Sequence, residues 1–177
     1  MKKLVIFILA IILMHPSVGN AQNKVDAEAR IKVLGIQLIT PTAPIANYVK
    51  AVRVGNMVYL SGHGPDKPDG GLVTGKVGGD LTLEQAMEAA RLTGISLLST
   101  LKAAIGDLNK VKRIVKVLGM VNAVPTFEQH PQVINGCSDL LVEVFGENGK
   151  HARSAVGMCS LPKNIAVEIE MIVELKE

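Results

Sequence analysis

The sequence predicts an α+β domain in which a mixed β-sheet has two main helices packed on one face. Apolar residues recur with helical spacing over residues 82–105 and 131–145, and they alternate as in strands over several other stretches. Helical and alternating stretches are interleaved along the chain, which favours an α+β class. Residues 22–177 contain no repeat, low-complexity segment or Pro/Ser linker, so we expect a single domain there.

The first elements are short. Asp26 is a suitable N-cap for a helix that ends before Gly35, because its carboxylate can accept a hydrogen bond from the first helical turn. Residues 49–54 and 57–62 alternate as strands, and the two-residue link Gly55-Asn56 predicts a hairpin between them.

The clearest helix begins at Thr82, where Thr82 and Gln85 have the spacing of a capping box, and ends before Gly106. Its expected buried stripe is Leu83, Ala86, Met87, Ala90, Gly94, Leu97, Leu98, Leu101 and Ile105. Residues 111–121 alternate as a strand, with Val115 expected on its apolar face together with Val111 and Val117.

A second helix is predicted over residues 131–145, followed by two alternating arms at 151–160 and 165–173. The Leu-Pro-Lys-Asn link around Pro162 predicts that these arms form an antiparallel hairpin. The two-residue period places Arg153 on one face with small residues, so we expect empty volume beside the arginine. These small residues are Ala155, Gly157 and Cys159.

The first 21 residues have the zones of a secretory signal peptide: two lysines, an apolar run over residues 4–14, and small residues up to Ala21. We expect cleavage near Ala21 and a periplasmic or secreted mature protein. The apolar run is shorter than the roughly 20 residues that span a bilayer. We therefore expect no membrane anchor after cleavage, with an uncleaved anchor as the alternative.

Charge and aromatic content disfavour a nucleic-acid partner. Removal of Lys2 and Lys3 with the leader reduces the 19 basic residues to 17 against 16 acidic residues, a net charge of +1. Four aromatic residues remain, too few for a base-stacking surface; they are Tyr48, Tyr59, Phe127 and Phe145.

We predict neither a metal nor a cofactor. The three histidines outside the leader are far apart in sequence, and no C-x-x-C or H-E-x-x-H spacing occurs. The glycine cluster at 75–80 lacks the phosphate-loop spacing and is expected to be a flexible loop. Cys137 and Cys159 are expected to be small core residues rather than nucleophiles.

Four blocks together resemble the RidA/YjgF family. Residues 152–170 read Ala-Arg-Ser-x-Val-x-x-x-x-Leu-Pro-x-x-x-x-Val-Glu-Ile-Glu, and further matches lie at 46–62, 115–122 and 133–146. The resemblance spans about residues 30–177 and is closest to the longer branch labelled endoribonuclease L-PSP or chorismate-mutase-like. It implies a chorismate-mutase-like fold and a homotrimer whose pockets lie between subunits.

The resemblance also implies roles for individual residues. Arg153 would bind a substrate carboxylate through its planar fork, Glu168 would position a water molecule, with Glu170 as the substitute, and Tyr48 would orient substrate or water. A surface ion pair, a solvated glutamate and a rim tyrosine are the respective structural alternatives. The remaining expected ligand contacts are Ser61, Gly62, Asn122 and Ala155. Asn122 could equally form a turn, and Ser61 and Gly62 a tight strand exit; a ligand contact of His63 stays open.

The predicted hairpin places Gly157, rather than Arg153, opposite Glu168. An offset of four residues is about 13 Å, too far for both side chains to hold one small ligand. We therefore expect the site to be completed across a subunit boundary.

The activity implied by the resemblance is hydrolysis of enamine or imine intermediates, such as 2-imino acids, to keto acids and ammonia. It needs no cofactor, because an imine carbon is already electrophilic. The alternatives are a non-catalytic binder of small carboxylates and, ranked lower on charge and aromatic content, an endoribonuclease. A chorismate mutase would need several cations around its dianionic substrate, and only Arg153 stands out in the sequence.

Overall fold

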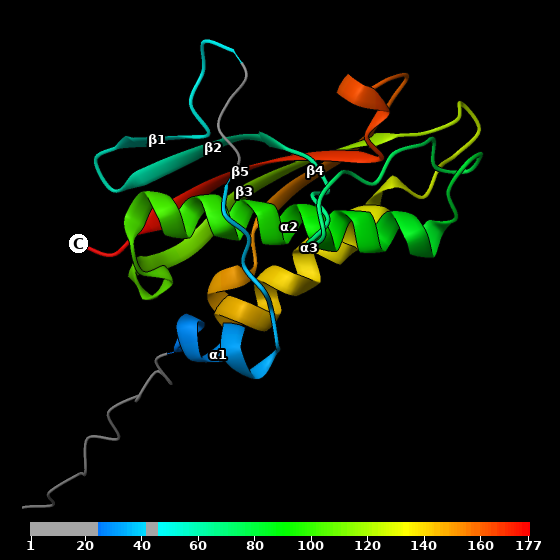
Figure 1. The fold of residues 1–177 in the computed structure, drawn as a ribbon. Coiled ribbons are helices and arrows are strands. Elements are labelled where there is room, and N and C mark those ends of the chain that lie inside the picture. The colour runs from blue at the N-terminus through cyan, green and yellow to red at the C-terminus, as the bar shows by residue number, and fades with distance from the viewer. Residues whose placement is uncertain (1–24, 42–45) are drawn as a thin grey trace, which may run out of the picture.

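The computed structural model describes residues 25–41 and 46–177; the predicted signal peptide lies outside these residues. Figure 1 shows the helices gathered on one side of a twisted sheet. The helices are α1 (Ala27–Val33), α2 (Leu83–Ile105) and α3 (His130–Phe145), and the strands are β1 (Ala51–Val54), β2 (Met57–His63), β3 (Val111–Asn122), β4 (Ala152–Met158) and β5 (Val167–Leu175). Short 3₁₀ turns lie at Leu108–Lys110, Gly146–Gly149 and Pro162–Asn164.

The five strands form one mixed sheet in the order β1-β2-β5-β3-β4. Neighbouring strands are antiparallel except β3 and β4, which are parallel. The two long helices α2 and α3 pack against each other and cover one face of this sheet, while α1 lies beyond α3 (Figure 1). The predicted α+β class with a mixed sheet and two main helices on one face is therefore confirmed.

Local capping signals fix the helix ends as the sequence predicted. The Asp26 side chain accepts a hydrogen bond from the Ala29 amide, and Thr82 and Gln85 form the reciprocal capping box. The two-residue turn at Gly55-Asn56 also forms, with Gly55 at a φ of 61°.

Helices α2 and α3 approach each other closely because each has a glycine where it contacts the other. A side chain at Gly94 of α2 would meet Leu140 and Cys137 of α3, and one at Gly136 of α3 would meet the Met87 backbone of α2. The predicted α2 stripe is buried except at Leu83 and Met87, which are half-buried near the start of the helix. Buried hydroxyl residues, which bond to backbone carbonyls one turn earlier, extend the stripe; these are Thr93, Ser96 and Ser99.

Strand β5 shows a clean alternation between the two sheet faces. Val167, Ile169, Met171 and Val173 are all buried beneath the helices, so Glu168 and Glu170 lie on the opposite, open face. In β3 the phase differs from the prediction, because irregularities in its pairing with β5 shift the alternation. Ile114 is therefore buried, and Val115 is only half-buried.

The predicted hairpin between residues 151–160 and 165–173 is wrong. Strand β3 lies between β4 and β5, so that Met120 pairs with Val156 on one side and Glu168 on the other. The helix α3 connects β3 to the parallel β4, as parallel neighbours require a crossover. Residues 159–166 then carry the chain past β3 to the start of β5.

The open face of the sheet carries a group of exposed apolar side chains. These side chains are Val52 of β1, Tyr59 of β2, and Val156 and Met158 of β4, each at least 36% exposed. Within the described residues, no helix is both long and apolar enough to span a bilayer.

Candidate functional site

A pocket of about 240 Å³ lies where β2 ends and β5 begins. It brings together three residues that the sequence predicted for the site, namely Tyr48, Gly62 and Glu168. The loop before β1 supplies Tyr48, which is 47% exposed. The other lining residues are Lys50, His63, Gly64, Asp66, Leu72, Pro162, Lys163 and Ile165.

Gly62 allows the Glu168 carboxyl group to lie directly against the backbone of β2. A Cβ atom at position 62 would collide with Oε1 of Glu168. The pairing of β2 with β5 is irregular between Leu60 and His63, so the strand bulges at this point. The bulge and the missing side chain together make room for the carboxyl group.

Glu168 is a half-buried carboxyl group with no hydrogen-bond or ion-pair partner among the described residues. Burial raises its pKa above the usual 4.5, and the charge of nearby Glu170 raises it further. Of these two causes, burial is the larger. A carboxyl group of this kind is suited to accepting a proton closer to neutral pH.

Two of the predicted groups lie beside this pocket rather than in it. Ser61 and Glu170 line a shallow hollow of about 300 Å³ on the open sheet face. The Ser61 amide donates a hydrogen bond of 3.0 Å to the Lys50 carbonyl, which ties the bulge to the segment that follows Tyr48.

His63, whose role the sequence left open, is buried and fully hydrogen-bonded. Its Nδ1 lies 2.7 Å from the Ser61 carbonyl and its Nε2 lies 2.8 Å from the Thr100 hydroxyl. A carbonyl can only accept, so Nδ1 carries the proton and Nε2 accepts from Thr100. Burial lowers the pKa of His63 and so favours the neutral ring. The two hydrogen bonds of this ring connect the bulge to α2.

Arg153 lies away from the pocket, on the helix-facing side of the edge strand β4. It pairs in register with the buried Val117, whereas Glu168 belongs to the row on the open face. The Arg153 Nη1 atom donates to Oδ1 of Asn135 at 2.8 Å and to Oγ of Ser138 at 3.0 Å. Arg153 forms no ion pair with any described residue, so it is not the surface ion pair of the structural alternative.

The expected empty volume beside Arg153 is not there. The side chain that Gly157 lacks would collide with His130 of α3, and one at Gly119 of β3 would collide with Ile134. Ala155 is half-buried and packs against the core. The small residues of this row therefore admit α3 onto the sheet, which the sequence could not reveal without knowing where the helix packs.

Asn122 is completely buried at the end of β3, and protein groups occupy its amide. Its Oδ1 accepts from Lys76 Nζ at 3.2 Å, and its Nδ2 donates to Oδ1 of Asn164 at 2.9 Å. Lys163 and Asn164 both have positive φ, near 55°, so this contact supports a strained turn at the rim of the pocket. The geometry favours the turn-forming alternative, and a ligand contact of Asn122 stays a prediction.

The cysteines differ from each other. Cys137 is buried in the core as predicted, and burial raises its pKa to about 12. Cys159 is exposed in the loop after β4, so its prediction as a core residue is wrong. The two thiols are not bonded to each other. In the described part of the chain, no three His, Cys, Asp or Glu side chains gather as metal ligands.

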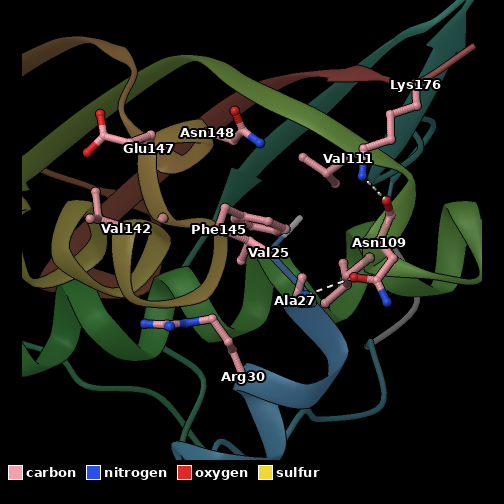
Figure 2. Close-up of a pocket in the computed structure, with 12 residues that line it drawn as sticks. Val25, Ala27, Arg30, Asn109, Val111, Val142, Phe145, Glu147, Asn148 and Lys176 are labelled. Carbon is pink, nitrogen blue, oxygen red and sulfur yellow. Dashed lines mark hydrogen bonds between the residues drawn. The ribbon is translucent and has the colours of Figure 1, made fainter. Parts of the chain in front are cut away.

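A larger cavity of about 870 Å³ lies at the other end of the sheet, near the C-terminus (Figure 2). Asn109 Oδ1 accepts from the Ala27 amide at 2.8 Å, and Lys176 Nζ donates to the Asn109 carbonyl at 2.6 Å. Arg30 donates through Nε to the Glu143 carbonyl. These bonds fasten α1 and the C-terminal residues to the domain, so the cavity is built around structural contacts.

The fold places this chain among α+β proteins of chorismate-mutase-like architecture. Its smaller pocket lies at one end of the sheet. Residues 28–175 match the family model described as "YjgF/chorismate mutase-like, putative endoribonuclease". The chain belongs to this YjgF/RidA family.

Three relatives illustrate the likeness. The chain is 44% identical over 148 residues to Protein TCP17 of Trypanosoma cruzi, covering 83% of this chain and 92% of that protein. It is 34% identical over 141 residues to a 2-iminobutanoate/2-iminopropanoate deaminase of Dermatophagoides farinae, with coverages of 77% and 94%. A solved structure of a protein of unknown function from Agrobacterium tumefaciens is 45% identical with a TM-score of 0.78, covering 85% of this chain and 94% of that one.

Proposed function

We propose that this protein hydrolyses 2-imino acids and their enamine tautomers to 2-keto acids and ammonia. The observation that carries the proposal is the half-buried Glu168 carboxyl group, which faces the pocket with Tyr48 and has no partner among the described residues. The 34% identity to a protein named 2-iminobutanoate/2-iminopropanoate deaminase supports the same reaction.

The chemistry requires only these side chains and water. Glu168 accepts a proton from a water molecule as the water oxygen bonds to the imine carbon and the C=N π electrons move to nitrogen. The substrate reacts as the protonated imine, so the proton that Glu168 returns to the nitrogen makes ammonia the leaving group. The C–N bond then breaks while the oxygen loses its proton and becomes the keto oxygen. Tyr48, at the pocket rim, would orient the water or the substrate.

If Arg153 is the carboxylate anchor, it must act at the pocket of another subunit, because it does not reach the pocket of its own chain. Arg153 and Glu168 of one chain lie on opposite faces of the sheet and two strands apart. Because β4 is an edge strand, Arg153 of one subunit could reach the pocket of a neighbour. We propose a homotrimer in which each site combines residues of two subunits, with the exposed apolar residues of the open face at the contact.

We further propose that the mature protein, residues 22–177, acts in the periplasm or outside the cell, because residues 1–21 have the zones of a signal peptide. Imines would there need a source other than a cytoplasmic enzyme. A non-catalytic carboxylate binder is the second candidate, since Arg153 carries an unneutralised charge. The near-neutral charge of the mature chain argues against an endoribonuclease.

The first test uses purified mature protein and freshly generated 2-iminopropanoate, with release of keto acid and ammonia as the readout. We expect acceleration over buffer, a loss of about 10²- to 10⁴-fold in kcat for Glu168→Gln, and a much smaller loss for Glu170→Gln. Wild-type protein that is folded and does not accelerate the reaction would refute the deaminase function. The reverse order of the two glutamate variants would assign the water to Glu170.

A complementation experiment tests the shared site. Arg153→Ala and Glu168→Gln subunits are each expected to be inactive, but trimers that mix them contain some interfaces with both native residues. Co-expressed subunits with distinct affinity tags should therefore regain part of the activity. Mixed trimers as inactive as either parent would contradict a site built from two subunits.

A further inference from the structure

The Arg153 guanidinium is held by two neutral side chains of α3. Asn135 and Ser138 are three residues apart, so they lie on the same face of the helix. Both accept hydrogen bonds from the single atom Nη1, at 2.8 and 3.0 Å. The two hydrogens of Nη1 are thereby used, and the orientation of the guanidinium plane is fixed from one side.

The contact continues from Ser138 to His151. Nδ1 of His151 lies 2.7 Å from the Gly149 carbonyl, so Nδ1 carries the proton and Nε2 is an acceptor. The Ser138 hydroxyl, 3.1 Å from Nε2, donates its only hydrogen to His151 and presents its lone pairs to Arg153. Burial lowers the pKa of His151, and the charge of Arg153 lowers it further. The hydrogen-bond direction along Arg153, Ser138 and His151 is therefore fixed.

The opposite edge of the guanidinium has no partner among the described residues. The Nε and Nη2 atoms of Arg153 donate to no group within the described part of the protein, and no described carboxylate lies within ion-pair distance. Nε and one Nη2 hydrogen form the parallel pair of donors that binds both oxygens of a carboxylate. Because the Asn135 and Ser138 side chains are both neutral, they orient the arginine without cancelling its charge.

We propose that Asn135, Ser138 and His151 are positioning residues that present the Nε–Nη2 edge of Arg153 to the carboxylate of the ligand. The inference rests on the proposed function insofar as Arg153 is the carboxylate anchor. A guanidinium ordered before binding loses less side-chain entropy when the ligand arrives. The three residues should thus act on affinity for the carboxylate rather than on the proton transfer at Glu168.

The experiment measures the dissociation constant for pyruvate, a keto-acid product, together with KM and kcat for 2-iminopropanoate, all on mature protein. For Ser138→Ala we expect the pyruvate Kd and the KM to rise about tenfold, with kcat within about threefold of wild type. Ser138→Thr keeps the hydroxyl and should restore both values. Asn135→Asp keeps the accepting oxygen but adds a negative charge, so it should weaken pyruvate binding at least as much as Ser138→Ala.

Ser96→Ala is the matched control, because this buried α2 serine donates only to the Leu92 carbonyl. It should change thermal stability without changing Kd or KM. If Ser138→Ala does not fold, Asn135→Asp carries the test, since it preserves the shape of the side chain. Wild-type Kd and KM in Asn135→Asp, or equal shifts in Ser96→Ala and Ser138→Ala, would overturn the inference.

Failure of the proposed function gives a different result. Wild-type protein could bind pyruvate, with weaker binding in Arg153→Lys, and still hydrolyse no 2-iminopropanoate. Deamination would then be refuted, while the pyruvate Kd values of the variants would still test the positioning residues. If wild-type protein does not bind pyruvate and Arg153→Lys leaves KM unchanged, Arg153 is not a carboxylate anchor. The inference about its positioning residues is then overturned as well.

Discussion

The two cavities at opposite ends of the sheet differ in whether they contain a half-buried carboxyl group without a protein partner. In the larger one, of about 870 Å³, Asn109, Arg30 and Lys176 all bond to backbone groups of the chain. In the smaller one, of about 240 Å³, the Glu168 carboxyl group has no partner among the described residues. A half-buried carboxyl group without a protein partner is partly desolvated, which raises its pKa and leaves its oxygens to a bound ligand or water. Unmet bonding capacity, rather than volume, therefore distinguishes a candidate site from a structural hollow.

Among variants that keep Glu168 itself, Gly62→Ala should have the largest effect on this comparison. The added methyl group collides with the Glu168 carboxyl group, so either the side chain leaves the pocket or the bulge opens. We expect kcat/KM to fall by about 100-fold or more and the free energy of unfolding to fall by about 1–3 kcal/mol. Steady-state kinetics and urea unfolding measure the two losses.

Ser61→Ala is the control for this variant, because it changes the neighbouring residue of the same bulge without adding volume. The Ser61 backbone bond to Lys50 is retained. A loss of activity in Ser61→Ala as large as in Gly62→Ala would mean that the bulge, rather than the space for Glu168, determines activity.

Glu168→Gln should separate activity from stability in the smaller cavity. Because burial raises the folded-state pKa of Glu168, the folded protein binds this proton more tightly than the unfolded chain, whose pKa is near 4.5. Wild-type stability thus declines as pH rises from about 4.5 through the raised pKa, and the glutamine variant escapes this decline. We expect the variant to melt about 2–4 °C higher at pH 7, with the gap closing near pH 4. A lower melting temperature at pH 7 would reveal a stabilising partner of the carboxylate.

The larger cavity should respond in the opposite way to Asn109→Ala. The change removes the acceptor for the Ala27 amide and the donor to Asp26, which both fasten α1. We expect unfolding free energy to fall by about 1–2 kcal/mol while kcat/KM stays within about twofold. Asn148→Ala, at an exposed position that lines the same cavity, should change neither quantity. A selective loss of activity in Asn109→Ala would show that the larger cavity takes part in function.

Local signals in the sequence predicted the element bounds because caps and tight turns act over a few residues. The Thr82 capping box and the Gly55-Asn56 turn are examples, and both form as expected. Strand partners could not be predicted in the same way. Alternation predicted strands within 151–160 and 165–173, but it does not show that β3 inserts between them.

The candidate site also combines residues that the sequence could identify with placements that depend on strand pairing. The family resemblance selected Tyr48 and Glu168, and the structure brings both into one pocket. It also selected Arg153, yet not the face of the sheet on which Arg153 lies, since that depends on the register of β3 and β4. Ser138 was missed because its role appears only once α3 packs over β4, and no sequence spacing encodes that contact.

His63 offers the smallest and sharpest test, because it borders the smaller cavity but has both ring nitrogens bonded as in a structural contact. Burial lowers its folded-state pKa below 6.5, so the stability contributed by the neutral ring is complete above pH 6.5 and is lost as pH falls through the folded pKa. His63→Gln can donate to the Ser61 carbonyl and accept from Thr100 without titrating. We expect a constant difference in melting temperature between wild type and variant above pH 7, and a relative gain for the variant of about 1–3 °C at pH 5, with kcat/KM nearly unchanged. Because His151 titrates in both proteins, the difference isolates His63. Parallel melting curves from pH 5 to 8 would show that His63 does not couple to pH, and a large loss of kcat/KM would move it from the structural contacts into the site.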